Sequence, residues 1–114
     1  MDWTEESEGR LLIVKLRGEI DLQHSPKLRQ LLQGKAAAKA PLLLLDFTEV
    51  KYIDSSGLAT LVEYYKNSRG FSGEFAVAGL SNRLRSIFDL VRLSEVFGIY
   101  PTVTEGREAL LAKG

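Results

Sequence analysis

Four consecutive residues, Asp54-Ser55-Ser56-Gly57, form the densest group of chemically active side chains in the sequence. They stand between an apolar stretch and an amphipathic stretch that begins at Leu58, so the pattern predicts a strand followed by a helix. The first turn of a helix carries backbone N–H groups without partners and the positive end of the helix dipole. A phosphate on Ser55 could be held there, and its roughly −1.5 to −2 charges beside Asp54 would repel a partner fitted to the neutral hydroxyl. Gly57 would leave room for a phosphate or a partner surface to approach closely.

The same four residues also have a purely structural interpretation. Asp and Ser are common at helix starts because their side-chain oxygens accept hydrogen bonds from free N–H groups. Asp54, Ser55 or Ser56 could therefore simply cap the helix, and the four residues alone favour this role.

Catalytic interpretations lack the partners that they need. A serine nucleophile requires a general base, and His24 is the only histidine. The Gly-x-Ser-x-Gly elbow of serine hydrolases is absent around Ser55, so a surface or capping-loop role is favoured for His24. Asp21 and Asp54 could form a carboxylate pair, but nothing marks a substrate cleft between them. We therefore expect Asp21 to be a turn residue or a partner contact, and the chain not to be an enzyme.

Composition excludes several other classes of function. The chain has no cysteine and one histidine, which excludes disulfides, thiolate catalysis and a histidine metal cluster. It has no Gly-rich phosphate loop of the Walker or Rossmann type. Lys+Arg and Asp+Glu balance at 15 each, so charge gives no reason to expect a nucleic acid as a direct partner. We expect no cofactor and no metal.

The chain is also expected to be a cytoplasmic protein that does not insert into a membrane. The residues from Met1 to Glu6 are polar and acidic, unlike a signal peptide, and the apolar run from Pro41 to Leu45 is far too short to span a bilayer. A length of 114 residues with 45% hydrophobic and 26% charged residues is typical of one globular domain, here residues 1–114.

Hydrophobic periodicity predicts the elements that position the serines. Alternation of apolar residues predicts strands, and apolar spacings of three and four predict helices. The expected strands cover residues 3–7, Leu11–Arg17, Leu42–Phe47, Glu74–Ala78 and Ile99-Tyr100. The expected apolar helix faces contain Leu28, Leu31 and Leu32; Leu58, Leu61, Val62 and Tyr65; Leu84, Ile87, Phe88 and Val91; and Ala109, Leu110 and Leu111.

Residues that start and stop helices agree with this order. Ser25-Pro26, Ser81 and Thr104 are expected to start the first, third and fourth helices, and Gly70 to end the second. Tyr65 is expected in the core and Tyr64 at the surface. Alternation of strands and helices predicts an α/β fold with a mixed sheet of four to five strands and about four helices.

The stretch from Leu45 to Leu58, LDFTEVKYIDSSGL, closely resembles the signature of the anti-sigma factor antagonist (STAS) family. That signature is a hydrophobic strand, a polar turn, and then Asp-Ser-Ser-Gly-Leu opening a helix. Arg17-Gly18-Glu19-Ile20-Asp21 is similar to the turn after the family's early strand, and the stretch from Ala78 to Leu93 is similar to its later strand and helix. The resemblance covers about residues 10 to 112.

The resemblance implies a STAS fold with its helices mainly on one side of the sheet. It implies that Ser55, and not Ser56, is the phosphoacceptor. The kinase would be the cognate anti-sigma factor, which binds the unphosphorylated form and thereby frees a sigma factor, and a serine phosphatase would restore that form. The contact surface implied for this chain consists of Asp21, His24, Asp54, Ser56, Gly57 and Leu58.

Two alternatives remain open at this point. The module could instead be a non-catalytic STAS scaffold subunit of a stress-signalling complex or of a membrane-transport ATPase complex. It could also be a small hydrolase that uses Ser55 or the Asp21/Asp54 pair, which the lack of a supported base, cleft or metal set disfavours. The intact Asp-Ser-Ser-Gly segment favours the phosphorylatable antagonist over the scaffold.

Overall fold

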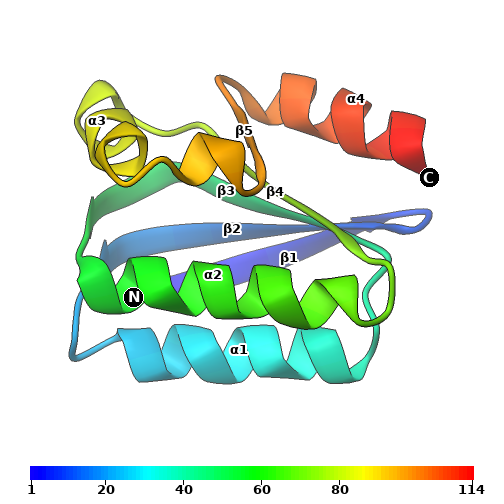
Figure 1. The fold of residues 1–114 in the computed structure, drawn as a ribbon, viewed down its shortest axis with the longest axis horizontal. Coiled ribbons are helices and arrows are strands. Elements are labelled where there is room, and N and C mark those ends of the chain that lie inside the picture. The colour runs from blue at the N-terminus through cyan, green and yellow to red at the C-terminus, as the bar shows by residue number, and fades with distance from the viewer.

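Strands and helices alternate along the chain in the computed structural model, which describes residues 1–114 (Figure 1). The elements are β1 (Asp2–Glu8), β2 (Leu11–Ile20), α1 (Ser25–Ala37), β3 (Leu42–Ile53), α2 (Ser55–Arg69), β4 (Glu74–Ala78), α3 (Asn82–Leu90), the 3₁₀ turn η1 (Leu93–Glu95), β5 (Gly98–Tyr100) and α4 (Val103–Lys113). The predicted order of five strands and four α-helices is therefore confirmed. None of the helices is long and apolar enough to cross a membrane.

The five strands form one mixed sheet in the order β1-β2-β3-β4-β5. β1 pairs antiparallel with β2, as an opening hairpin, and the other neighbours are parallel. Parallel neighbours bring their carboxyl ends to the same edge of a sheet. The loops that follow β2 and β3 therefore lie next to each other, which places the segment after Ile20 beside the segment after Ile53.

The two faces of the sheet are covered unequally (Figure 1). α1, α2 and α3 contribute to a large apolar cluster on one face, in which the rings of Phe47 and Phe88 meet edge to face with centroids 5.9 Å apart. α4 alone covers the other face, where Leu110 packs in a smaller cluster with Leu44. The expectation that the helices lie mainly on one side is confirmed.

β3 is longer than predicted. The apolar run suggested a strand that ends at Phe47, but pairing with β2 continues to Ile53. In this second half β3 has no hydrogen-bonded neighbour on its other side, because pairing with β4 stops at Asp46. Exposed polar residues such as Thr48 are therefore tolerated within the strand. In the sequence, these polar residues suggested a turn, and the strand was predicted to end before them.

The inward face of α2 differs from the predicted one. Leu61 is buried as expected, but Tyr64 is only 2% exposed whereas Tyr65 is half-buried, so the prediction for the two tyrosines was wrong. The reason is that α2 packs against α1 as well as against the sheet. The residues of α2 that lie between α1 and the sheet, such as Tyr64, are therefore the most buried.

Two predicted caps and one core residue also differ. Ser25 is the first residue of α1, not its cap, and α4 is capped by Thr102 instead of Thr104, through the N–H of Glu105. Val91 is 50% exposed, because α3 ends at Leu90 and the chain turns away from the core. The cap at Ser81 is confirmed by its hydrogen bond from the Leu84 N–H at 3.2 Å. 

The buried Tyr64 hydroxyl makes no hydrogen bond, and burial raises its pKa to about 12. An unsatisfied buried hydroxyl destabilises a fold, so Tyr64→Phe should increase the free energy of unfolding by about 1 kcal/mol in a denaturant titration. The control is Tyr65→Phe, which removes a hydroxyl that accepts a hydrogen bond from Arg69 at 2.9 Å and should give no gain. A clear loss of stability in Tyr64→Phe would mean that this hydroxyl has a partner.

Candidate functional site

Asp54 joins the two loops that meet at the carboxyl edge of the sheet. Its backbone N–H donates to the carbonyl of Ile20 at 3.1 Å, and its Oδ2 accepts from the N–H of Leu22 at 3.0 Å. Both partners come from the end of β2 and the loop before α1. One aspartate therefore fixes the position of that loop relative to the start of α2.

The second carboxylate oxygen of Asp54 caps α2. Oδ1 accepts from the Ser56 N–H at 3.0 Å, from the Ser56 hydroxyl at 2.6 Å and from the Gly57 N–H at 3.2 Å. The sequence left Asp54, Ser55 and Ser56 as possible caps of this helix, and the structure shows that the cap is Asp54. Ser56 is engaged by this cap, whereas the side chain of Ser55 is exposed and makes no hydrogen bond.

This arrangement corrects one expectation about a phosphate on Ser55. The N–H groups of Ser56 and Gly57, which were expected to hold it, already donate to Asp54. A phosphate would therefore find these two donors taken and a carboxylate beside it. The phosphate would then point outward to solvent or to a partner, without hydrogen bonds from these two N–H groups.

Asp54 keeps its negative charge over a wide pH range. The hydrogen bond from the Ser56 hydroxyl, aided by the N–H groups of Gly57, Ser56 and Leu22 and opposed by partial burial, lowers the pKa of Asp54 below its usual value. At neutral pH the carboxylate beside Ser55 is therefore ionised.

Replacement of this carboxylate should make stability less dependent on acid pH. Because the folded pKa of Asp54 is depressed, its contribution is present above the usual aspartate pKa of about 3.9 and is lost as the pH falls through the folded pKa. Asp54→Asn should have a lower Tm than wild type at about pH 7, and the difference should shrink towards about pH 3. Thermal unfolding at both pH values measures this, and equal Tm values at neutral pH would contradict the role of Asp54 as a cap.

Asp21 and His24 form a compact turn before α1. His24 Nδ1 lies 2.7 Å from Asp21 Oδ1, and the His24 N–H donates to the same oxygen at 3.1 Å. Burial favours the neutral form of Asp21, but the hydrogen bonds from the His24 ring and backbone outweigh it and lower the pKa of Asp21. Asp21 was expected to be a turn residue or a partner contact, and the structure shows it as a turn residue.

Ser55 has no general base bonded to it. The His24 ring is engaged by Asp21, and the oxygens of Asp54 accept from N–H and hydroxyl groups. No group of three or more His, Cys, Asp or Glu side chains is placed to hold a metal ion.

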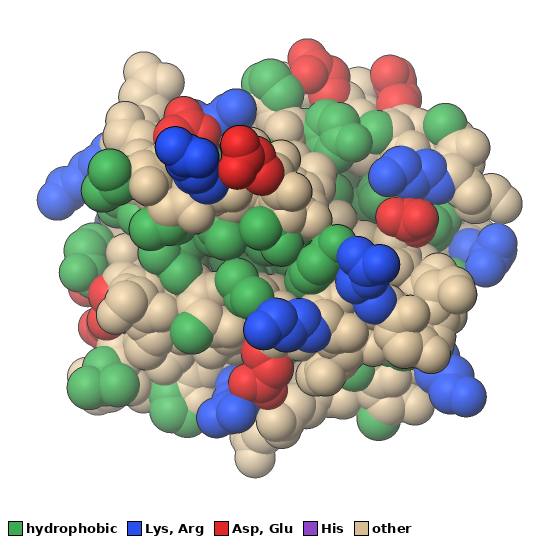
Figure 2. Space-filling view, in the orientation of Figure 1, with side chains coloured by type: hydrophobic (Ala, Val, Ile, Leu, Met, Phe, Trp, Pro, Cys, Tyr) green, Lys and Arg blue, Asp and Glu red, His purple; other side chains and the backbone are tan.

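An apolar surface extends from the site along one side of α2. Leu58, Val62 and Tyr65 are half-buried there, facing α3 and η1, and Tyr65 packs against Phe97 with ring centroids 6.1 Å apart. Figure 2 shows hydrophobic side chains gathered along the hollow between α2 and the segment of α3 and η1. Leu58, an expected contact residue, thus lies on the side of α2 that faces α3, away from the turn that contains Asp21.

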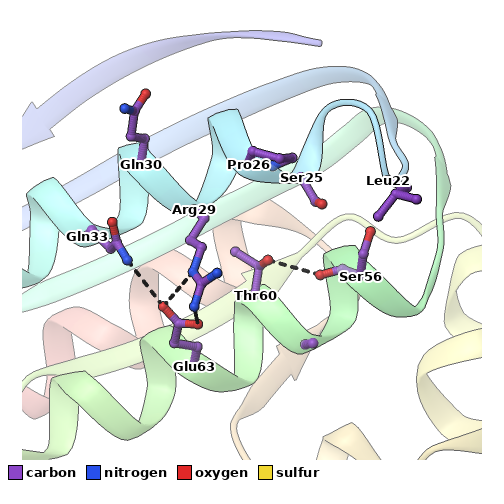
Figure 3. Close-up of a pocket in the computed structure, with 10 residues that line it drawn as sticks. Leu22, Ser25, Pro26, Arg29, Gln30, Gln33, Ser56, Thr60 and Glu63 are labelled. Carbon is purple, nitrogen blue, oxygen red and sulfur yellow. Dashed lines mark hydrogen bonds and ion pairs between the residues drawn. The ribbon is translucent and has the colours of Figure 1, made fainter.

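A groove of about 450 Å³, lined mainly by polar residues, runs along the other side of α2, between α1 and α2 (Figure 3). Its end near Ser55 is lined by Leu22, Ser25 and Ser56. Leu22 is 75% exposed, and it is not among the contact residues expected from the sequence. The available signal was a large apolar residue in a turn that otherwise consists of polar residues.

Comparison with known proteins places this arrangement in one family. The family model described as STAS domain matches residues 3–106. The anti-sigma-B factor antagonist of Listeria monocytogenes is 37% identical over 82 residues, which cover 72% of each chain, and that of Bacillus subtilis is 34% identical over 86 residues, covering 75% of this chain and 78% of the relative. The crystal structure of an anti-sigma factor antagonist from Mycobacterium paratuberculosis superposes with a TM-score of 0.89 at 27% identity, covering 96% of this chain and 93% of the other.

Proposed function

This chain belongs to the STAS domain family, and we propose that it is an anti-sigma factor antagonist that phosphorylation of Ser55 switches off. The observation that carries the proposal is the difference between the two serines at the start of α2. Ser56 is bonded to Asp54 at 2.6 Å, whereas the exposed hydroxyl of Ser55 is free.

The unphosphorylated form binds an anti-sigma factor and so releases a sigma factor. The contact surface combines the Asp21–His24 turn with the start of α2, where Asp54 holds the two together. Ser56 and Leu58 extend this surface along α2. Gly57 was expected to contribute to it, but it is buried, and its lack of a side chain makes room for Ile20 and Ile53 inside the fold. A surface fixed by hydrogen bonds in this way loses little conformational freedom on binding.

Phosphorylation by the anti-sigma factor, acting as an ATP-dependent serine kinase, ends the interaction. The phosphate adds roughly −1.5 to −2 charges next to the ionised Asp54 carboxylate. Since the N–H groups of Ser56 and Gly57 already donate to Asp54, they do not neutralise this charge, which is presented to the partner and disfavours the complex. A serine phosphatase restores the binding form, and the whole cycle takes place in the cytoplasm, with this chain as its non-catalytic member.

Displacement of a sigma factor tests the proposal. The chain is titrated into a preformed complex of a sigma factor and its cognate anti-sigma factor, and free sigma factor is measured by size-exclusion chromatography. We expect release by the unmodified chain and none by chain phosphorylated at Ser55. Binding that is unaffected by phosphorylation would instead support a constitutive scaffold subunit.

A further inference from the structure

We propose that the groove between α1 and α2 is a second recognition site for the anti-sigma factor, and that it takes an uncharged, hydrogen-bonding segment of that partner. This inference rests on the proposed function. It adds a contact on the side of α2 opposite to the apolar surface that contains Leu58. The partner would then enclose the first turns of α2 from both sides, with Ser55 at the centre.

The groove contains a largely buried side chain whose hydroxyl has no partner within the chain. Ser25 is only 6% exposed, and its hydroxyl bonds to no other residue but is open to the groove. In Figure 3 this hydroxyl points from α1 into the groove, towards the part of α2 that carries Ser56. A nearly buried hydroxyl that has no internal partner is suited to bond a group that enters the groove from outside.

The charges in the groove determine which groups fit. Arg29 and Glu63 face each other across it, with Nε–Oε1 at 3.0 Å and Nη2–Oε2 at 2.7 Å (Figure 3). Because these two charges satisfy each other, an entering charged side chain would lose water and gain no counter-charge. An amide, a hydroxyl or a peptide group has no such cost and can bond to Ser25.

The groove is continuous with the phosphorylation site. Ser56 lines the groove and also donates to Asp54, and Leu22 lines it while its N–H bonds to the same carboxylate. The exposed Leu22 side chain gives the mouth an apolar rim. A phosphate on Ser55 would lie beside this mouth, so one modification would disturb partner binding both at the first turn of α2 and in the groove.

Filling the groove from an exposed position tests this site without disturbing the core. Ala59 lines the groove and is exposed, and Ala59→Trp would occupy the space that the partner needs. The matched control is Ala112→Trp, at an exposed alanine of α4 on the opposite face of the sheet. Affinity of each unphosphorylated variant for the cognate anti-sigma factor is measured by isothermal titration calorimetry, after circular dichroism has shown an unchanged fold.

We expect Ala59→Trp to bind at least about tenfold more weakly than wild type and Ala112→Trp to bind like wild type. Ser25→Ala should weaken binding by about fivefold, through loss of one hydrogen bond. Wild-type affinity in Ala59→Trp, together with loss of binding on phosphorylation of Ser55, would overturn the groove proposal and leave the proposed function standing. Absence of binding by the wild-type chain itself would overturn both.

Discussion

Ser55→Asp is expected to weaken binding to the anti-sigma factor by about a hundredfold, a loss of about 2.7 kcal/mol. The new carboxylate would lie at the exposed start of α2 next to ionised Asp54, and the N–H groups of Ser56 and Gly57 are not available to neutralise it. Ser55→Ala should bind like wild type, because the Ser55 hydroxyl makes no hydrogen bond. Dissociation constants from isothermal titration calorimetry measure both effects.

The matched control places the same charge at a serine at the other end of the sheet. Ser7 is exposed on β1, where it pairs with Leu12 near the start of β2, and Ser7→Asp should leave the affinity unchanged. The chain phosphorylated at Ser55 should bind more weakly still than Ser55→Asp, because a phosphate carries more charge than a carboxylate. Tight binding by both the phosphorylated chain and Ser55→Asp would be incompatible with a charge-based switch.

Gly57→Ala is expected to destabilise the protein by about 1 to 3 kcal/mol, because it overfills a closely packed position. A Cβ at Gly57 would lie 2.7 Å from Ile53 Cγ1, 2.8 Å from Ile20 Cγ2 and 3.0 Å from the Ile20 carbonyl oxygen. The backbone of β2 cannot easily retreat, so the start of α2 would move away and carry Ser55 with it. We therefore expect weaker binding to the anti-sigma factor in addition to a lower free energy of unfolding.

Gly34 provides the control for this substitution. It lies in α1 and is exposed, and a Cβ there would have no atom within 4 Å. Gly34→Ala should stabilise the protein by about 0.5 to 1 kcal/mol, because alanine loses less backbone entropy than glycine in a helix. Urea titrations of the two variants should shift in opposite directions, and a stability equal to wild type in Gly57→Ala would refute the close packing at this position.

The fold was largely predictable because most of its information is local. Alternation along Leu12, Val14 and Leu16 defines a strand whose side chains reach the large cluster, as observed. The Asp-Ser-Ser-Gly segment marks the start of α2, and Ser81 marks the start of α3. These signals lie within a few residues of the structure that they specify.

The remaining features depend on neighbours that are distant in the sequence. The burial of Tyr64 in place of Tyr65 follows from where α1 packs, which no local pattern encodes. The bond from Leu22 to Asp54 requires β2 and β3 to be adjacent in the sheet, and it joins residues 32 positions apart. The partner-free hydroxyl of Ser25 likewise emerges only once α1 lies beside α2.

Phosphoryl transfer to Ser55 tests the proposed switch most directly. The chain is incubated with ATP and its cognate anti-sigma factor, and intact masses of wild type, Ser55→Ala and Thr104→Ala are compared, the last as a variant with another exposed hydroxyl removed. We expect one added phosphoryl group on wild type and on Thr104→Ala, and none on Ser55→Ala. A phosphoryl group on Ser55→Ala, or an unmodified wild-type chain that still binds the anti-sigma factor tightly, would contradict the proposed switch.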